Sequence, residues 1–200
     1  MAAPIDFYFD FSSPYGYFAS KLVDGVAAKH GREVTWHPML LGAAFKVVGT
    51  LPLVELPLKG DYARHDFSRV ARFHGVPFTV PSKFPVGSVA ASRAFYWLQD
   101  RDPALAKRYA HAIFDAFYVQ GRDISDPAIA LAVAKESGAD PAALSAALAD
   151  PAVKERLKSE VDAAIAKGIF GSPWFVVDGE PFWGVDRLPM VERWLETGGW

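Results

Sequence analysis

Apolar and polar side chains alternate strictly in the first segment of the chain. In residues 5–11, IDFYFDF, every second side chain is Ile or Phe, and the intervening ones are Asp or Tyr. This period of two predicts a β-strand. Ser13 then has the position of a helix N-cap, Pro14 has that of the first helical residue, and one helix is predicted from there to Gly31. The apolar residues of this helix recur every four positions at Phe18, Leu22 and Val26.

A second strand is predicted over residues 32–40, REVTWHPML. Strand, helix and strand at this spacing indicate a right-handed βαβ unit whose two strands are parallel. Residues 42–87 are rich in Pro and Gly, and only one helix is expected there, over residues 60–74. A further helix is predicted near residues 88–100.

Four helices that follow share one start signal, the dipeptide Asp-Pro. The Asp side chain can accept hydrogen bonds from free backbone N–H groups, and Pro suits a first turn whose N–H needs no partner. Gly ends several of these segments. The predicted helices span residues 103–120, 127–137, 141–149 and 151–167.

The end of the chain returns to β-structure. Residues 174–184, WFVVDGEPFWG, predict a hairpin that turns at Asp178-Gly179, and Pro181 places its second strand at a sheet edge. A closing helix follows, with Asp186 as a possible N-cap. The order βαβ, helices, ββα predicts an α/β thioredoxin-like fold with an all-helical insertion domain. The discontinuous thioredoxin-like domain comprises residues 1–40 and 152–200, and the insertion comprises residues 41–151.

Composition narrows the class of protein. Of 200 residues, 51% are hydrophobic and 22% charged, which is typical of a globular chain. The formal net charge of −2, without long runs of one sign, argues against a non-specific nucleic-acid binder or a membrane-surface binder. No apolar stretch approaches the roughly 20 residues that span a bilayer. The first residues contain no basic region, so no signal peptide and a cytoplasmic location are expected.

The chain contains no cysteine. Disulfides, thiolate metal sites and a protein thiol nucleophile are therefore excluded. The five histidines show no spacing typical of metal ligands, so no metal site is expected.

Ser13 admits two interpretations from the residues alone. It can cap the first helix, as the Asp-Pro starts do. It can also stabilise an anion, because it lies at the carboxyl end of the first strand, where α/β sheets bind ligands, and at the positive end of a helix. A second Ser-Pro, Ser172-Pro173, precedes the hairpin. A thioredoxin-like fold would place it opposite Ser13.

Three motifs resemble a known family: FYFDFSSPYGY at residues 7–17, FHGVPFTVP at 73–81 and GIFGSPWFVVDGEPFWGVDRL at 168–188. They are similar to the glutathione-dependent 2-hydroxychromene-2-carboxylate isomerases, which are related to kappa-class glutathione transferases and to DsbA-type oxidoreductases. The Cys-x-x-Cys of DsbA-type enzymes matches Ser13 and Gly16, so exchange through protein thiols is impossible here. The resemblance implies glutathione as the cofactor, with Ser13 donating a hydrogen bond to its thiolate.

The resemblance also implies the remaining glutathione contacts. Pro173 should follow a cis peptide bond and leave the Ser172 backbone free to pair with the cysteinyl part of glutathione. The segment Trp183, Gly184, Val185 and Asp186 matches the part of the family that holds the γ-glutamyl end. Asp186 either pairs with the glutathione ammonium or simply caps the last helix, and both interpretations stay open.

On the substrate side, Lys46 matches a family lysine assigned to the substrate, and Phe84 either walls an aromatic ring or packs in a loop. Family members place an Asn after that lysine, but this chain has no Asn, and Thr50 stands at the best-matching position. The implied reaction converts 2-hydroxychromene-2-carboxylate to trans-o-hydroxybenzylidenepyruvate. The expected partners are a small aromatic carboxylate and a second copy in a homodimer. The alternatives are a kappa-type glutathione transferase and a catalytically silent thioredoxin-like binding domain.

Overall fold

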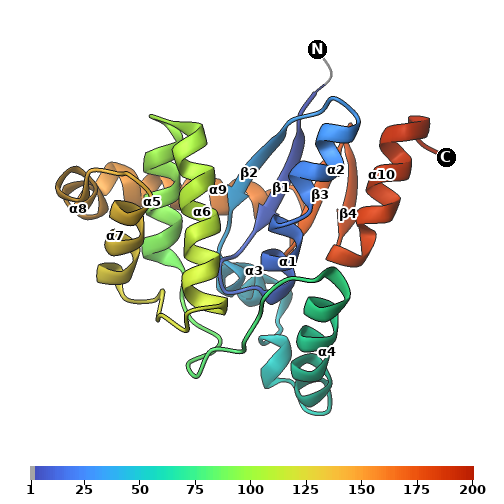
Figure 1. Ribbon diagram of the computed structural model, residues 1–200, viewed down its shortest axis with the longest axis horizontal. Coiled ribbons are helices and arrows are strands. Elements are labelled where there is room, and N and C mark those ends of the chain that lie inside the picture. Colours follow the sequence, from blue (N-terminus) through green and yellow to red (C-terminus); the bar gives the residue numbers. More distant parts are fainter. Residues whose placement is uncertain (1–2) are drawn as a thin grey trace.

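A four-stranded mixed sheet forms the centre of the computed structural model, which describes residues 3–200. Figure 1 shows helices in front of the sheet and behind it, with a helical block to one side. The strand order is β2-β1-β3-β4, with β1 parallel to β2 and antiparallel to β3. Strand β4 is at the edge, as Pro181 predicts, and pairs antiparallel with β3. The order of elements is the predicted thioredoxin-like one.

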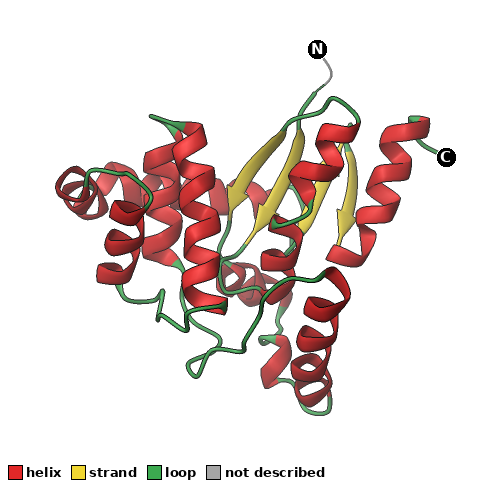
Figure 2. Cartoon of the chain, in the orientation of Figure 1, coloured by secondary structure: helices red, strands yellow, loops and turns green. Residues whose placement is uncertain are grey.

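The strands are β1 (Ile5–Phe9), β2 (Val34–Pro38), β3 (Trp174–Val177) and β4 (Glu180–Trp183). The helices are α1 (Pro14–Ser20), α2 (Val23–Lys29), α3 (Leu41–Val48), α4 (Lys59–His74), α5 (Val89–Gln99), α6 (Pro103–Tyr118), α7 (Pro127–Glu136), α8 (Pro141–Ala149), α9 (Pro151–Ala166) and α10 (Leu188–Thr197). Two short 3₁₀ turns complete the structure, η1 (Leu53–Glu55) and η2 (Val185–Arg187). Figure 2 shows helices, in red, on both sides of the yellow strands.

Aromatic side chains from both parts of the chain share one core. The predicted apolar face of the first strand is fully buried, and Phe9 packs against Trp36 of β2 and Phe114 of α6. The same hydrophobic cluster continues from the sheet through α5 to α8. The predicted boundary between residues 1–40 with 152–200 and residues 41–151 remains a prediction, and residues 1–2 of it lie outside the described part.

The opposite face of the sheet has its own smaller cluster. Tyr8 of β1 packs there with Trp174 of β3 and with Ala164 of α9. This face was predicted to be polar, but helix α9 covers it, and Tyr8 is only 4% exposed. The sheet therefore has both faces covered, as parallel strands usually require.

The Asp-Pro signals predict four helix starts correctly. Helices α6, α7, α8 and α9 each begin at the predicted Pro, and each preceding Asp accepts a backbone N–H in the first turn. Their ends lie within two residues of the predicted ones. Local capping is sufficient to define these starts.

The first helix is an exception, because the single predicted helix is broken into α1 and α2. Ser20 Oγ donates a hydrogen bond to the Tyr17 carbonyl at 2.6 Å. That carbonyl is the acceptor that the Lys21 N–H would use in a continuous helix, and Lys21 N–H bonds instead to Phe18 O. Such back-bonding by Ser bends helices.

Two further predictions about helix starts are wrong. Helix α3 lies in the segment expected to contain no helix before residue 60, and its N-cap Leu40 provides no side-chain bond. Its first N–H, from Leu41, donates to the Asp10 carboxylate of the distant β1–α1 loop. Helix α10 has no side-chain cap either, and Asp186 makes no capping bond to it. Within residues 3–200, none of the helices combines the length and apolarity needed to cross a membrane.

Candidate active site

Ser13 occupies the junction between the end of β1 and the start of α1. Its Oγ accepts a hydrogen bond from Gly16 N at 3.1 Å, so it is the N-cap of α1. The same Oγ donates to the carbonyl of Ser172 at 3.1 Å. The side chain is 5% exposed. Ser13 therefore caps the helix and also faces the second Ser-Pro, while its role toward an anion remains a prediction.

The Ser172-Pro173 peptide bond is cis, as the resemblance implies. The turn that it forms lies opposite the start of α1, because Ser172 contacts both Ser13 and the end of β1. Ser172 Oγ accepts a hydrogen bond from Asp10 N at 3.0 Å. A second cis bond, Phe84-Pro85, is present in the loop before α5 and was not predicted.

At Gly16 the backbone of α1 lies close to the cis-proline turn. A Cβ atom at Gly16 would lie 2.7 Å from Ser172 Oγ and 3.3 Å from Ser13 Cβ. This contact is shorter than real Cβ atoms accept, and Ser172 Oγ is already fixed by its bond from Asp10. Any side chain at Gly16 would therefore push against Ser172 Oγ and disturb its hydrogen bond from Asp10 N.

Two backbone N–H groups close to Ser13 are candidate donors for a ligand. They belong to Tyr15, in the first turn of α1, and to Ser172, whose carbonyl accepts from Ser13 Oγ. Pro14 between Ser13 and Tyr15 has no N–H. Helix α1 has only seven residues, so the Ser13 hydroxyl and these N–H groups, rather than a long helix dipole, are the donors that an anion would meet.

Beneath Ser13 lies a buried acid, Asp10, which is 5% exposed. Its carboxylate accepts from Ser12 N at 2.8 Å, from Leu41 N at 2.7 Å and from Ser88 Oγ at 2.8 Å. Burial raises the pKa of this carboxyl group, while the three donors oppose that change. The alternating pattern placed Asp10 on the polar face of a strand and gave no sign of these contacts.

The segment predicted to hold the γ-glutamyl end is tied to the cis-proline turn. Gly184 N donates to Pro173 O at 3.0 Å, and Gly184 has a φ of +112°, which favours glycine. Val185 is buried, while Trp183 is 54% exposed and stacks edge-on against Phe170. The turn η2, with Asp186, packs against α1.

Asp186 points largely into solvent. Its side chain is 70% exposed and lies 3.6 Å from Arg187 in a loose ion pair. Because the last helix has no side-chain cap, the capping interpretation is wrong. The interpretation that Asp186 binds an ammonium group remains a prediction.

The three predicted substrate residues lie on separate elements. Lys46 is exposed on α3 and has no ion-pair partner among the described residues. Thr50 follows the end of α3, where its N–H donates to Phe45 O. Phe84 is half-buried and packs edge-on against Phe67 of α4, with ring centroids 6.0 Å apart. Phe84 therefore has a loop-packing role, and a wall for substrate remains a prediction.

Sequence reasoning also missed a contact that fixes α4 against the site. Tyr15 donates its hydroxyl to Asp66 at 2.5 Å, and Asp66 is in turn paired with Arg69. Burial and the Asp66 carboxylate raise the pKa of Tyr15. No spacing in the sequence links residues so far apart.

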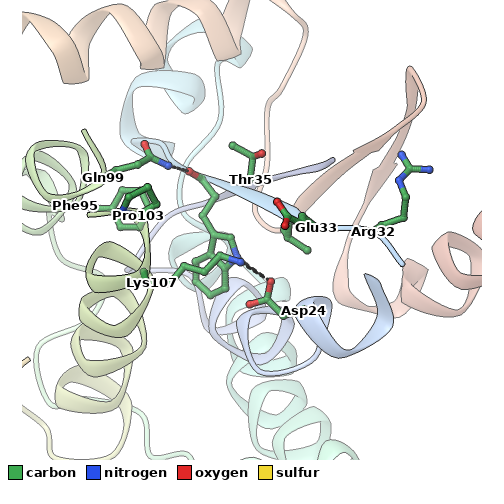
Figure 3. A pocket seen from close by; sticks show the side chains of 11 residues that line it. Asp24, Arg32, Glu33, Thr35, Phe95, Gln99, Pro103 and Lys107 are labelled. Carbon is green, nitrogen blue, oxygen red and sulfur yellow. Dashed lines mark hydrogen bonds and ion pairs between the residues drawn. The ribbon is translucent and has the colours of Figure 1, made fainter. Parts of the chain in front are cut away.

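A cavity of about 620 Å³ lies elsewhere, beside the edge strand β2. Two of the hydrogen bonds at this cavity are drawn in Figure 3, in which Gln99 donates to the Trp36 carbonyl and Asp24 accepts from the Trp36 indole. Lys107 also pairs with Asp24, at 2.7 Å. None of the predicted site residues lines this cavity. In the described part of the chain, no cluster of His, Asp and Glu forms a metal site either.

Comparisons with known proteins identify the family and the fold of the chain. Residues 4–196 match the family model of the DSBA-like thioredoxin domain. A 2-hydroxychromene-2-carboxylate isomerase of Pseudomonas putida is 29% identical over 190 residues, which cover 94% of this chain and 92% of that protein. Glutathione S-transferase kappa 1 of Homo sapiens is 26% identical over 208 residues, which cover 96% and 92%.

A solved structure of a 2-hydroxychromene-2-carboxylate isomerase is also similar. It has a TM-score of 0.86 and 28% sequence identity, and the match covers 96% of this chain and 94% of that chain. The resemblance that the three motifs carry is therefore confirmed. The predicted thioredoxin-like α/β fold with a helical insertion is confirmed as well.

Proposed function

The chain belongs to the DSBA-like thioredoxin domain family, and we propose that it is a glutathione-dependent isomerase that converts 2-hydroxychromene-2-carboxylate to trans-o-hydroxybenzylidenepyruvate. The observation that carries this proposal is the position of Ser13. A buried hydroxyl faces the cis-proline turn at the place where DsbA-type enzymes have a cysteine, in a chain without cysteine. Such a site keeps donors for a thiolate and must obtain the sulfur from another molecule.

The residues present suit the thiol and the backbone of glutathione. Ser13 Oγ–H and the Tyr15 N–H are donors for a thiolate, and the N–H of Ser172 can pair with the cysteinyl carbonyl. Ser172 is therefore assigned to the peptide part, next to Pro173. Asp186 has an exposed carboxylate suited to the γ-glutamyl ammonium, with Trp183, Gly184 and Val185 forming the turn that carries it.

When bound, glutathione supplies a thiolate that adds reversibly to a conjugated enone and so allows a former double bond to rotate to the trans isomer. The residues of this chain lower the cost of forming that anion. A free thiol titrates near pH 8.5, and nearby donors lower this value. In the structure the Ser13 hydroxyl donates to the neutral Ser172 carbonyl, and a charged acceptor in its place forms a stronger hydrogen bond.

The substrate is proposed to be a small aromatic carboxylate held from the α3 side. Lys46 is an exposed cation without an ion-pair partner in residues 3–200, as a carboxylate-binding residue requires. Thr50 replaces the amide of the family with one donor and one acceptor. Phe84 would contribute its ring edge to the aromatic side of the pocket.

Calorimetric titration with glutathione in buffers of different ionisation enthalpy tests the first step. At pH 6.5 we expect binding accompanied by proton release, because the enzyme ionises the thiol, and at pH 9.5 we expect little release. Conversion of 2-hydroxychromene-2-carboxylate, followed by ultraviolet absorbance, then requires catalytic amounts of glutathione. Absence of both binding and conversion would refute the proposal.

A second candidate is a kappa-type glutathione transferase, which the human kappa relative favours at nearly the same identity as the isomerases. The two activities differ in the fate of glutathione. An isomerase regenerates it, whereas a transferase consumes it with an electrophilic halo-arene. Measuring free thiol during turnover separates them, and a silent binding domain would show neither reaction.

The proposal includes a homodimer that works in the cytoplasm. Sedimentation velocity at micromolar concentration tests the dimer. A single species with the mass of one chain, 21.9 kDa, would contradict it. Fractionation of cells that express the chain tests the location.

A further inference from the structure

Asp10 forms hydrogen bonds to several distant segments, and the proposed reaction does not require them. Its backbone N–H donates to Ser172 Oγ at 3.0 Å, and its backbone C=O accepts from Ser13 N at 2.9 Å. Its carboxylate accepts three further bonds, from Ser12 N, Leu41 N and Ser88 Oγ. One buried residue is thus bonded to the β1–α1 loop, the cis-proline turn, the start of α3 and the start of α5.

The backbone and the side chain of Asp10 serve different halves of the site. The two backbone bonds reach Ser13 and Ser172, which are the residues assigned to glutathione. The side chain reaches Leu41, the first residue of the helix that carries Lys46 and is followed by Thr50. The neighbouring Ser12 accepts from Val86 N at 3.0 Å and so fixes the loop that contains Phe84.

The Asp10 carboxylate satisfies the start of α3. This helix has no cap from its own N-cap residue, so its first N–H relies on Asp10 Oδ2 at 2.7 Å. Asp10 Oδ1 takes the other two donors, Ser12 N and Ser88 Oγ. No Lys, Arg or His pairs with Asp10 among residues 3–200, which leaves these three donors to stabilise the buried carboxylate.

We propose that Asp10 is a positioning residue that holds the substrate half of the site in register with the glutathione half through the hydrogen bond from Leu41. This inference rests on the proposed function for the roles of the two halves. It assigns a role to Asp10, which contacts neither ligand and acts through the backbone of α3. Since the Ser13 and Ser172 contacts use the Asp10 backbone, they survive a change of its side chain.

The substitution Asp10→Asn tests the proposal with almost no change of shape. An amide has one carbonyl oxygen, and at the Oδ1 position this oxygen keeps two donors. The NH₂ group then faces the Leu41 N–H, and two donors cannot pair. Asp6→Asn is the matched control, because Asp6 lies on β1 four residues before Asp10 and pairs with His37, and not with Leu41 or Ser88.

The expected result is a split between the two ligands. In Asp10→Asn the dissociation constant of glutathione stays within about twofold, while KM for 2-hydroxychromene-2-carboxylate rises roughly tenfold, as the loss of one buried hydrogen bond predicts. Hydrogen exchange at the amides of Leu41 and the first turn of α3 accelerates. Asp6→Asn changes none of the three. Equal loss of both affinities, or no change in either, would overturn the proposal.

A gentler variant covers the case in which Asp10→Asn does not fold. Ser88→Ala removes one donor and leaves the carboxylate, and we expect a smaller rise in KM, roughly threefold, with glutathione binding kept. If wild-type protein neither binds glutathione nor isomerises the substrate, the proposed function fails. Two results would still refute the Asp10 role: unchanged protection at Leu41 in Asp10→Asn, or an unchanged KM in Ser88→Ala.

Discussion

Replacing Ser13 by Ala removes the hydroxyl that links helix α1 to the cis-proline turn. Gly16 N loses its cap acceptor, and the Ser172 carbonyl loses its donor, each now 3.1 Å from Ser13 Oγ. Loss of a helix cap costs about 1 kcal/mol. A buried polar group left without a partner costs about 1–3 kcal/mol, so we expect the free energy of unfolding to fall by roughly 2–4 kcal/mol.

The effect on activity has a different origin and a larger expected size. A hydrogen bond to a charged group contributes about 1.5–3 kcal/mol, and each 1.4 kcal/mol is a factor of ten. If Ser13 donates to the thiolate, Ser13→Ala should raise the pKa of bound glutathione by about one to two units. Turnover at neutral pH should fall roughly 10- to 100-fold.

The matched control is Ser20→Ala, at the other end of the same helix. Ser20 is also buried, 2% exposed, and its Oγ donates to the Tyr17 carbonyl. The substitution should lower stability without changing the thiol. The assay is the pH dependence of thiolate absorbance in the glutathione complex of each variant, together with kcat/KM and urea unfolding.

One result would refute the role of Ser13. If Ser13→Ala and Ser20→Ala lose similar stability and both keep the thiol pKa of wild type, Ser13 is only a cap. A loss of turnover without a change in thiol pKa would place its effect in the position of the cis-proline turn instead.

Three further substitutions have defined outcomes. Gly16→Ala should favour the helix by up to about 1 kcal/mol, yet reduce kcat/KM at least tenfold, because its Cβ meets Ser172 Oγ at 2.7 Å; wild-type activity would contradict this. Gly184→Ala should cost about 1–3 kcal/mol in urea unfolding, since φ is +112° there, and an unchanged midpoint would argue against it. The hydrogen bond from His37 lowers the pKa of Asp6, so Asp6 stabilises the fold above pH 3.8 and this contribution disappears as pH falls below it. The difference in unfolding free energy between wild type and Asp6→Asn should therefore shrink in acid, and a difference independent of pH would disprove the pairing.

The sequence alone determines those parts of the structure whose signals lie within a few residues of one another. Asp126 and Asp140 cap the helices that begin at the next residue, and the Asp178-Gly179 turn joins the two strands beside it. These interactions are local, so neighbouring residues contain all the information. The absence of cysteine likewise excludes protein thiol chemistry whatever the fold, because composition does not depend on how the chain packs.

The candidate site could be predicted only in its outline. The three motifs indicate Ser13 and the cis bond before Pro173, but the bond between Ser13 and Ser172 joins residues 159 positions apart. Two predictions about helix starts are wrong for the same reason, because both assume that neighbouring residues signal the start of a helix. They are the cap at Asp186 and the lack of a helix at α3.

Tertiary structure decided what Asp10 does. The cap of α3 comes from 31 residues earlier, and Ser88 reaches the same carboxylate from 78 residues later. Alternation along β1 shows only that Asp10 lies opposite the Phe face. Whether such a side chain meets solvent or the starts of two helices depends on how the sheet packs, because a backbone N–H that loses water must find a partner wherever the fold provides one.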